Sequence, residues 1–142
     1  MHLTVEFLGE IQDDRVYLIK GIMYELEFEA FTLNLSKIGY FKRPEGNIYW
    51  LGIEYNVILL NLNKKLRQGL IGKGFQLEDR GYRPHITLGR KVKLKDGFNT
   101  DELEDLVKKI EIHIDKVDLM KSEFINGKLI HSLVYSRPLR HV

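Results

Sequence analysis

The chain has 142 residues, which is enough for one domain with a buried core but too few for two independent domains. A hydrophobic fraction of 44% and a charged fraction of 30% exclude a disordered or fibrous class. The net charge of +2 excludes a surface that binds nucleic acid all over, and the absence of cysteine excludes disulfides and thiolate metal sites.

Targeting signals are not visible in the sequence. No apolar run approaches the roughly 20 residues of a membrane-spanning helix. The first residues also lack the basic start and apolar stretch of a secretion signal. We therefore expect no contact with a membrane and a cytoplasmic location.

The first predicted elements cover residues 2–54. HLTVEFLG at 2–9 is a candidate strand, and an amphipathic helix is expected after Asp13 and Asp14, where apolar residues recur at helical spacing. Alternation over 31–36 predicts a second strand. A turn at 44–47 then leads to a return strand, IYWLGIE at 48–54.

A third segment separates this unit from the next. Its apolar residues favour a helix that ends at Gly72 and Gly74: Ile58, Leu59, Leu62, Leu66 and Leu70. The polar loop FQLEDRGYRP at 75–84 follows.

The elements after residue 84 repeat the order of the first unit. HITLGRKV at 85–92 is a candidate strand, and Asn99 with Glu102 resembles a capping pair before a helix that extends to Ile110. Alternation at 111–114 predicts a strand. Asn126 and Gly127 predict a hairpin turn, followed by the return strand KLIHSLVYS.

The pattern of strand, helix, strand, hairpin and strand thus occurs twice, with an offset of 83 residues. We interpret residues 1–142 as a single two-lobed domain, with repeat one at about 1–55 and repeat two at about 56–142. The predicted fold class is α+β, with pseudo-symmetric β-α-β-β units and antiparallel sheets around a central cleft.

Each candidate strand that opens a unit carries the motif His-x-Thr. Residues i and i+2 of a strand point to the same face, so His2 lies beside Thr4 and His85 beside Thr87. The residues between and after them face the opposite side and are expected to enter the core: Leu3, Val5, Ile86 and Leu88. Two lobes related by pseudo-symmetry would bring both imidazoles and both hydroxyls together.

Paired histidines suit in-line displacement at phosphorus. One neutral imidazole accepts a proton while a charged one donates a proton to the leaving oxygen. Threonine hydroxyls and arginine can hydrogen-bond the other phosphate oxygens. Arg83 and Arg90 flank the second motif, and by strict alternation Arg90 needs a twist or bulge at Gly89 to reach the side of His85.

With these two motifs the sequence resembles the two-histidine phosphoesterases, in particular the RNA 2′,3′-cyclic phosphodiesterases once named 2′-5′ RNA ligases. The resemblance rests on HLTVEFLGE and RPHITLGR and continues through WLGI at 50–53 and the SEF and VYSRPL segments. It covers essentially the whole chain. Two matched motifs in the right order are far more specific than either motif alone.

The resemblance implies a bilobal α+β fold that hydrolyses a 2′,3′-cyclic phosphate to a 2′-phosphomonoester without a metal or cofactor. It assigns His2 as the proton donor to the leaving 3′ oxygen and His85 as the acceptor that activates water. It assigns Thr4, Thr87 and Arg90 to phosphate binding. The implied partner is an RNA or oligonucleotide with a cyclic phosphate end, and reversible 2′-5′ ligation is also associated with the family.

One departure from the family concerns the first motif, before which relatives carry a strand and a helix. This chain starts at the motif, which would leave a sheet edge open. We therefore expect that the N-terminal strand and helix are missing, through truncation or a mis-assigned start, or that a second copy covers the gap in a homo-oligomer.

Several alternatives stay open. One alternative is a non-catalytic RNA-binding module, which would keep the fold without needing both imidazoles. Another is a metal-dependent hydrolase, but the sequence contains no His-Glu-x-x-His spacing. His113 is interpreted as a surface residue, His131 as either a cleft residue or a surface residue, and His141 lies in the C-terminal tail. Trp50 and Tyr49 could stack on a base but favour packing. Lys91, Lys93 and Lys95 could follow an RNA backbone but favour a solvated edge.

Overall fold

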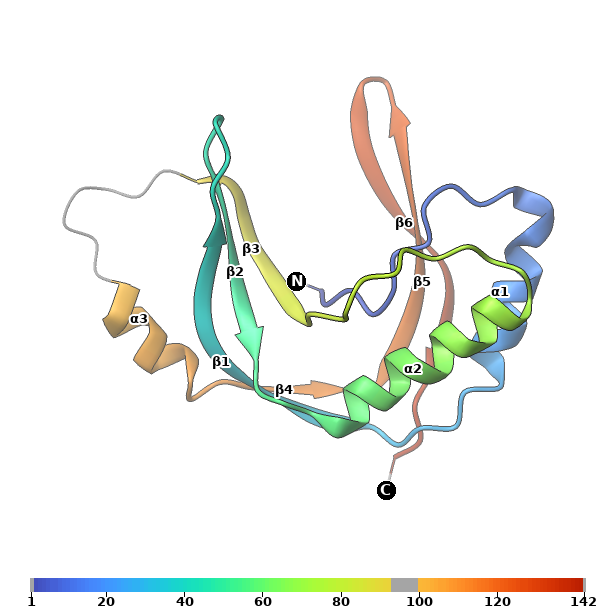
Figure 1. Cartoon of the computed structure of the whole chain (residues 1–142), viewed down its shortest axis with the longest axis horizontal. Coiled ribbons are helices and arrows are strands. Elements are labelled where there is room, and N and C mark those ends of the chain that lie inside the picture. Colours follow the sequence, from blue (N-terminus) through green and yellow to red (C-terminus); the bar gives the residue numbers. More distant parts are fainter. Residues whose placement is uncertain (1, 93–99, 142) are drawn as a thin grey trace.

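A computed structural model of the chain describes residues 2–92 and 100–141, without the side chains of residues 91, 92 and 100. It is an α+β fold with a four-stranded antiparallel sheet, a two-stranded hairpin and three α-helices (Figure 1). The helices are α1 (Val16–Tyr24, after a 3-10 turn at Asp13–Arg15), α2 (Val57–Gly72) and α3 (Thr100–Val107). The strands are β1 (Phe31–Phe41), β2 (Asn47–Ile53), β3 (His85–Val92), β4 (Glu111–Ile114), β5 (Lys116–Ile125) and β6 (Lys128–Pro138).

Local sequence explains the ends of α2. The side-chain oxygen of Asn56 accepts a hydrogen bond from the backbone N–H of Leu59 at 3.0 Å, which satisfies a donor of the first turn. Gly74 follows the helix with φ of +88°, a conformation that ends helices and favours glycine. The predicted helix and its stop are therefore confirmed.

The two tight turns also follow from the sequence. Asn126 and Gly127 have φ values of +52° and +77°, and positive values at both central residues match a two-residue hairpin turn between β5 and β6. Gly46 has φ of +128° in the turn between β1 and β2. Both predicted hairpins are confirmed.

The four-stranded sheet has the order β3-β2-β1-β4 and combines strands from both halves of the sequence. β1 and β2 come from the first half, whereas β3 and β4 come from the second and pair with their outer edges. The β5–β6 hairpin stands apart from this sheet (Figure 1). The internal duplication stays a prediction, with its two repeats at about 1–55 and 56–142.

Two apolar clusters form the interior. The larger one joins α1, α2, the start of β1 and β5, with Leu33, Leu59 and Leu70 almost fully buried. The smaller one lies between the sheet and α3: Leu35, Leu51, Ile86 and Val107. Leu3 packs against both clusters, so the N-terminal segment lies where they meet.

Several local predictions were wrong. Residues 2–9 form no strand and make only one isolated bridge, because side chains rather than a ladder hold their backbone. Leu88 is 46% exposed because a register shift in β3 breaks the alternation. α3 ends at Val107, and Ile110 lies in the tight turn beyond it.

Other predictions are not addressed by the described residues. The Asn99 cap and the side chains of Lys91, Lys93 and Lys95 lie outside them. Within the described part of the chain, none of the helices combines the length and the apolar composition needed to cross a membrane.

Candidate active site

The two His-x-Thr motifs meet at a single antiparallel bridge between Leu3 and Ile86. The pairing ends at this bridge, and only a regular ladder continued from it would set His2 opposite Thr87 and Thr4 opposite His85. In such a ladder, Cβ atoms of directly opposite residues lie about 5 Å apart and those of diagonal neighbours about 7 to 8 Å apart. The bridge therefore makes the two motifs neighbours although 83 positions separate them.

Pairing with β2 fixes the face of the sheet to which the second motif points. Thr87 is opposite Trp50 and His85 is opposite Gly52. Ile86 alternates with them and is buried in the cluster beneath α3. The motif side chains thus occupy the sheet face that α3 does not cover, and we call this the site face.

Contacts on both sides hold the His85 ring. Its Nδ1 lies 2.8 Å from the backbone oxygen of Arg83, and because a carbonyl only accepts, Nδ1 carries the proton. The rings of Phe41 and Trp50 each lie 6.2 Å from the imidazole in edge geometry. Only Nε2 is left to exchange a proton.

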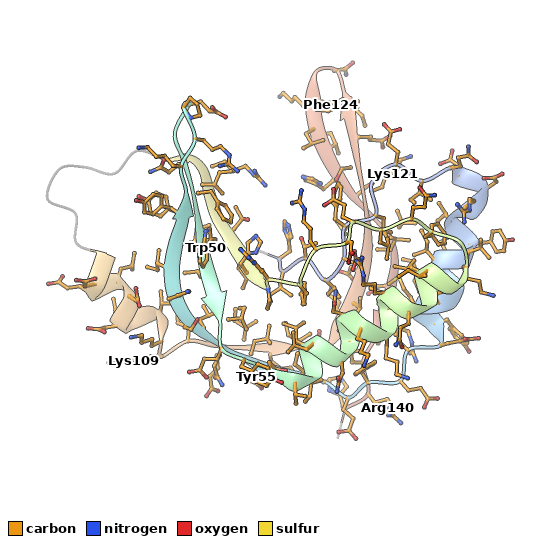
Figure 2. All side chains as sticks on the ribbon, in the orientation of Figure 1. Trp50, Tyr55, Lys109, Lys121, Phe124 and Arg140 are labelled. Carbon is orange, nitrogen blue, oxygen red and sulfur yellow. The ribbon has the colours of Figure 1, made fainter. Side chains whose placement is uncertain are left out.

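Trp50 lies on the site face beside His85, and Figure 2 labels it on β2. A Cβ atom built on Gly39 would lie 2.1 Å from Cζ2 of the indole, so only glycine lets the ring rest on β1. The ammonium of Lys37 lies 5.9 Å from the ring centroid. The indole Nε1 is buried without a hydrogen-bond partner within the described structure.

The first motif is held by side chains from α2 and the loop 75–84. The Tyr82 hydroxyl donates to the backbone oxygen of Thr4 at 2.8 Å. Nδ2 of Asn63, the one buried polar side chain among the described residues, donates to the backbone oxygen of Val5 at 2.7 Å. These bonds replace the strand ladder that the sequence predicts there.

An ion pair extends this support. Nη1 of Arg67 lies 2.9 Å from Oε1 of Glu6, and the two side chains are only 24% and 10% exposed. The other guanidinium nitrogen, Nη2, donates to the backbone oxygen of Glu78. Burial and, to a smaller extent, the negative charge of Glu6 raise the pKa of Tyr82 well above its ordinary value of 10.0, so the phenol stays a donor.

The phosphate-binding candidates differ in exposure. Thr4 and Arg90 are exposed, and Thr87 is half-buried. Trp50 pairs with Thr87 but Tyr49 pairs with Gly89, so Leu88 is an extra residue in β3. A second register shift follows between Gly89 and Val92, so the strict alternation that would turn Arg90 away from His85 is broken on both sides of Gly89.

The remaining candidates lie elsewhere. His113 is exposed on β4, with its ring 6.5 Å from that of His141, and His131 is hydrogen-bonded to Ser122 across the β5–β6 hairpin. All three histidines are exposed, which confirms the surface prediction for His113. Tyr49 pairs with Tyr40, whereas Trp50 packs beside His85.

A surface hollow and the arrangement of possible metal ligands were compared with the predicted site. A hollow of about 410 Å³ contains none of the predicted site residues and is lined by Phe28, Asn61, Lys64, Lys65 and Gln68. Within the described residues, no group of three or more His, Cys, Asp or Glu side chains could hold a metal ion.

Sequence reasoning missed the residues that support the first motif. Asn63 lies four residues after Leu59 and three before Leu66, on the apolar stripe of α2. A polar residue in that phase is a signal that could have identified it. Arg67 and Tyr82 carry no comparable signal, because their partners are 11 to 78 positions away.

The chain is similar to known proteins over most of its length. A family model described as the 2′-5′ RNA ligase superfamily matches residues 1–123. A Thermotoga maritima protein named RNA 2′,3′-cyclic phosphodiesterase is 32% identical over 95% of this chain and 73% of its own length. A Bacillus subtilis protein of the same name is 33% identical over 68% of this chain and 55% of its own length.

Solved structures agree with these sequence matches. Escherichia coli LigT in complex with 3′-AMP superposes with a TM-score of 0.74 at 26% identity, over 97% of this chain and 76% of that chain. A crystal structure described only as a phosphoesterase gives a TM-score of 0.75, also at 26% identity, over 98% of this chain and 76% of that one.

Proposed function

The chain belongs to the 2′-5′ RNA ligase superfamily, and we propose that it hydrolyses 2′,3′-cyclic phosphate ends of RNA to 2′-phosphomonoesters by acid and base catalysis with His2 and His85. The names of the Thermotoga and Bacillus relatives support the reaction. The observation that supports the mechanism is the Leu3–Ile86 bridge, because it brings the two His-x-Thr motifs side by side.

His85 is the base in this proposal. Its Nδ1 proton is committed to the Arg83 carbonyl, so a neutral ring presents a bare Nε2 to water. Nε2 takes the proton as the water oxygen attacks phosphorus. The bond between phosphorus and the 3′ oxygen breaks opposite the new bond.

His2 is the acid. It is exposed and gives its proton to the departing 3′ oxygen, which leaves a free 3′-hydroxyl and a 2′-phosphate. The hydroxyls of Thr4 and Thr87 and the guanidinium of Arg90 hold the non-bridging phosphate oxygens. In 2′-5′ ligation the 5′-hydroxyl of a second RNA would take the place of water: its oxygen bonds to phosphorus, His85 takes its proton, and the bond to the 3′ oxygen breaks as before, so the same groups would serve that reaction and its reversal. We place this activity in the cytoplasm.

The test uses a short oligoribonucleotide with a 2′,3′-cyclic phosphate end, incubated with the protein with and without EDTA. We expect a 2′-phosphate product at the same rate in both, and a rate that passes through a maximum with pH, because one imidazole must be bare while the other is protonated. A rate that changes in only one direction with pH would contradict the paired roles. Tight binding without turnover would favour the alternative, a non-catalytic RNA-binding module.

A further inference from the structure

Four side chains tie residues 4–6 to α2 and the loop 75–84: Glu6, Asn63, Arg67 and Tyr82. We infer that they form a latch that positions His2 against β3, and that Arg67 and Tyr82 are positioning residues for the reaction. This inference rests on the proposed function.

Arg67 is the link between two stretches of chain. One nitrogen of its guanidinium pairs with Glu6 in the N-terminal segment, and the other donates to the Glu78 carbonyl in the loop 75–84. A lysine ammonium is a single point charge and cannot make both bonds in this fork geometry. The half-buried position strengthens the pair relative to one in open solvent.

The loop that Arg67 holds contacts both motifs. Tyr82 donates to the Thr4 carbonyl, and the next residue, Arg83, accepts the Nδ1 proton of His85. Two consecutive loop residues therefore hold the two motifs. Any shift of this loop changes the position of one imidazole relative to the other.

The first motif needs such support because its backbone makes only the Leu3–Ile86 bridge to the sheet. An exposed histidine on a segment with one bridge would sample several positions. Misplacement of a reacting group by about 1 Å can cost roughly 100-fold in rate. The latch narrows that range without touching the substrate.

The kinetic test compares Arg67→Lys and Tyr82→Phe with matched controls. Arg80→Lys alters an arginine that pairs with Glu78 in the same loop, but these side chains are 82% and 65% exposed. Tyr17→Phe removes the hydroxyl of an exposed tyrosine. We expect kcat on the cyclic phosphate to fall by about 10-fold or more in the latch variants, with KM nearly unchanged. In the two control variants kcat should stay at the wild-type value.

A double-variant cycle separates positioning from general damage. If the latch acts through His2, then Tyr82→Phe made in a His2→Ala background lowers the remaining rate no further. A loss as large as that in the wild-type background would overturn the inference. Tyr82→Phe decides the matter if Arg67→Lys proves unstable, because it removes a single oxygen atom.

Hydrogen exchange gives a readout that does not depend on activity. Amides of residues 2–9 should exchange faster in Tyr82→Phe than in the wild type or in Tyr17→Phe, with the melting temperature lowered by no more than a few degrees. Unchanged exchange would refute the latch even in an active enzyme. Faster exchange in a protein that fails to hydrolyse the cyclic phosphate would refute the proposed function and leave the latch in place as a structural element.

Discussion

The two His-x-Thr motifs have the same residue pattern but different structural support. His85 and Thr87 lie on β3, an eight-residue strand paired with β2 along its length, and two aromatic rings contact the imidazole. His2 and Thr4 lie on a segment with one bridge, anchored by Tyr82 and by residues of α2. One motif is held by backbone pairing and the other by side chains.

This difference separates what determines the chemistry of a motif from what determines its position. Two His-x-Thr sequences indicate imidazole and hydroxyl groups in the same arrangement. The backbone hydrogen bonds around them depend on neighbours that the motif does not specify. The anchors of the first motif come from 58 and 78 positions away, whereas His85 has its carbonyl partner two residues away.

The largest effect is expected from substitutions that remove the imidazoles themselves. We expect His2→Ala and His85→Ala each to lower kcat on the cyclic phosphate by roughly 10² to 10⁴-fold, because each takes away one half of the proton transfer. The double variant should lose little more than the worse single variant, since the two groups act as a unit.

His113→Ala is the control for this pair, because that ring is exposed on β4 and contacts only His141 among the ring pairs of the described structure. It should retain full activity. If His2→Ala kept most of its activity while His85→Ala lost it, the two motifs would differ in chemistry as well as in support.

Gly39→Ala perturbs the β3 motif alone. The new Cβ would lie 2.1 Å from the Trp50 ring, which must move away from β1 and from His85. We expect a loss of about 1 to 3 kcal/mol in the free energy of unfolding, the usual cost of overpacking, measured by urea denaturation. Hydrogen exchange of residues 2–9 should stay as in the wild type.

Gly81→Ala serves as the control, because a Cβ there would meet nothing within 4 Å. Equal destabilisation by both substitutions would mean that the contact between Trp50 and β1 contributes nothing specific to the support of His85.

Local patterns predicted the part of the site on β3. The polar and apolar alternation of HITLGRKV predicts this strand, and the positions of His85 and Ile86 on opposite faces follow from the period of two. Sequence also predicted α1, α2 and both hairpins, since helical spacing, the Asn-Gly pair and terminal glycines are local signals.

The rest depended on tertiary contacts. Residues 2–9 alternate like a strand, yet Tyr82 and Asn63 bind the carbonyls that a ladder would use. The sequence indicates that Arg90 needs a bulge near Gly89, but the position of that bulge at Leu88 depends on the pairing of β3 with β2. Strand order likewise follows from how distant segments pack, not from periodicity.

Asn63→Leu weakens the support of the first motif. The substitution keeps the shape of the side chain but removes the donor to the Val5 carbonyl. We expect a loss of about 1 kcal/mol in the free energy of unfolding, because water can reach a carbonyl in this half-exposed segment and limit the cost. Asn61→Leu, on the exposed side of the same helix, should have no effect on unfolding or on exchange at residues 2–9.

The smallest expected effect appears at alkaline pH. Because burial raises the pKa of Tyr82 in the folded protein, the unfolded chain loses the Tyr82 proton near pH 10 while the folded chain keeps it. The unfolded state then binds fewer protons, so this contribution to stability is complete below pH 10 and decreases as pH rises further. At pH 10.5 the decrease is at most about 0.8 kcal/mol. Above pH 10, the denaturant midpoints of Tyr82→Phe should decline less steeply than those of the wild type. Those of Tyr17→Phe should follow the wild type. Parallel curves for all three proteins would mean that the Tyr82 hydroxyl is not buried against the first motif.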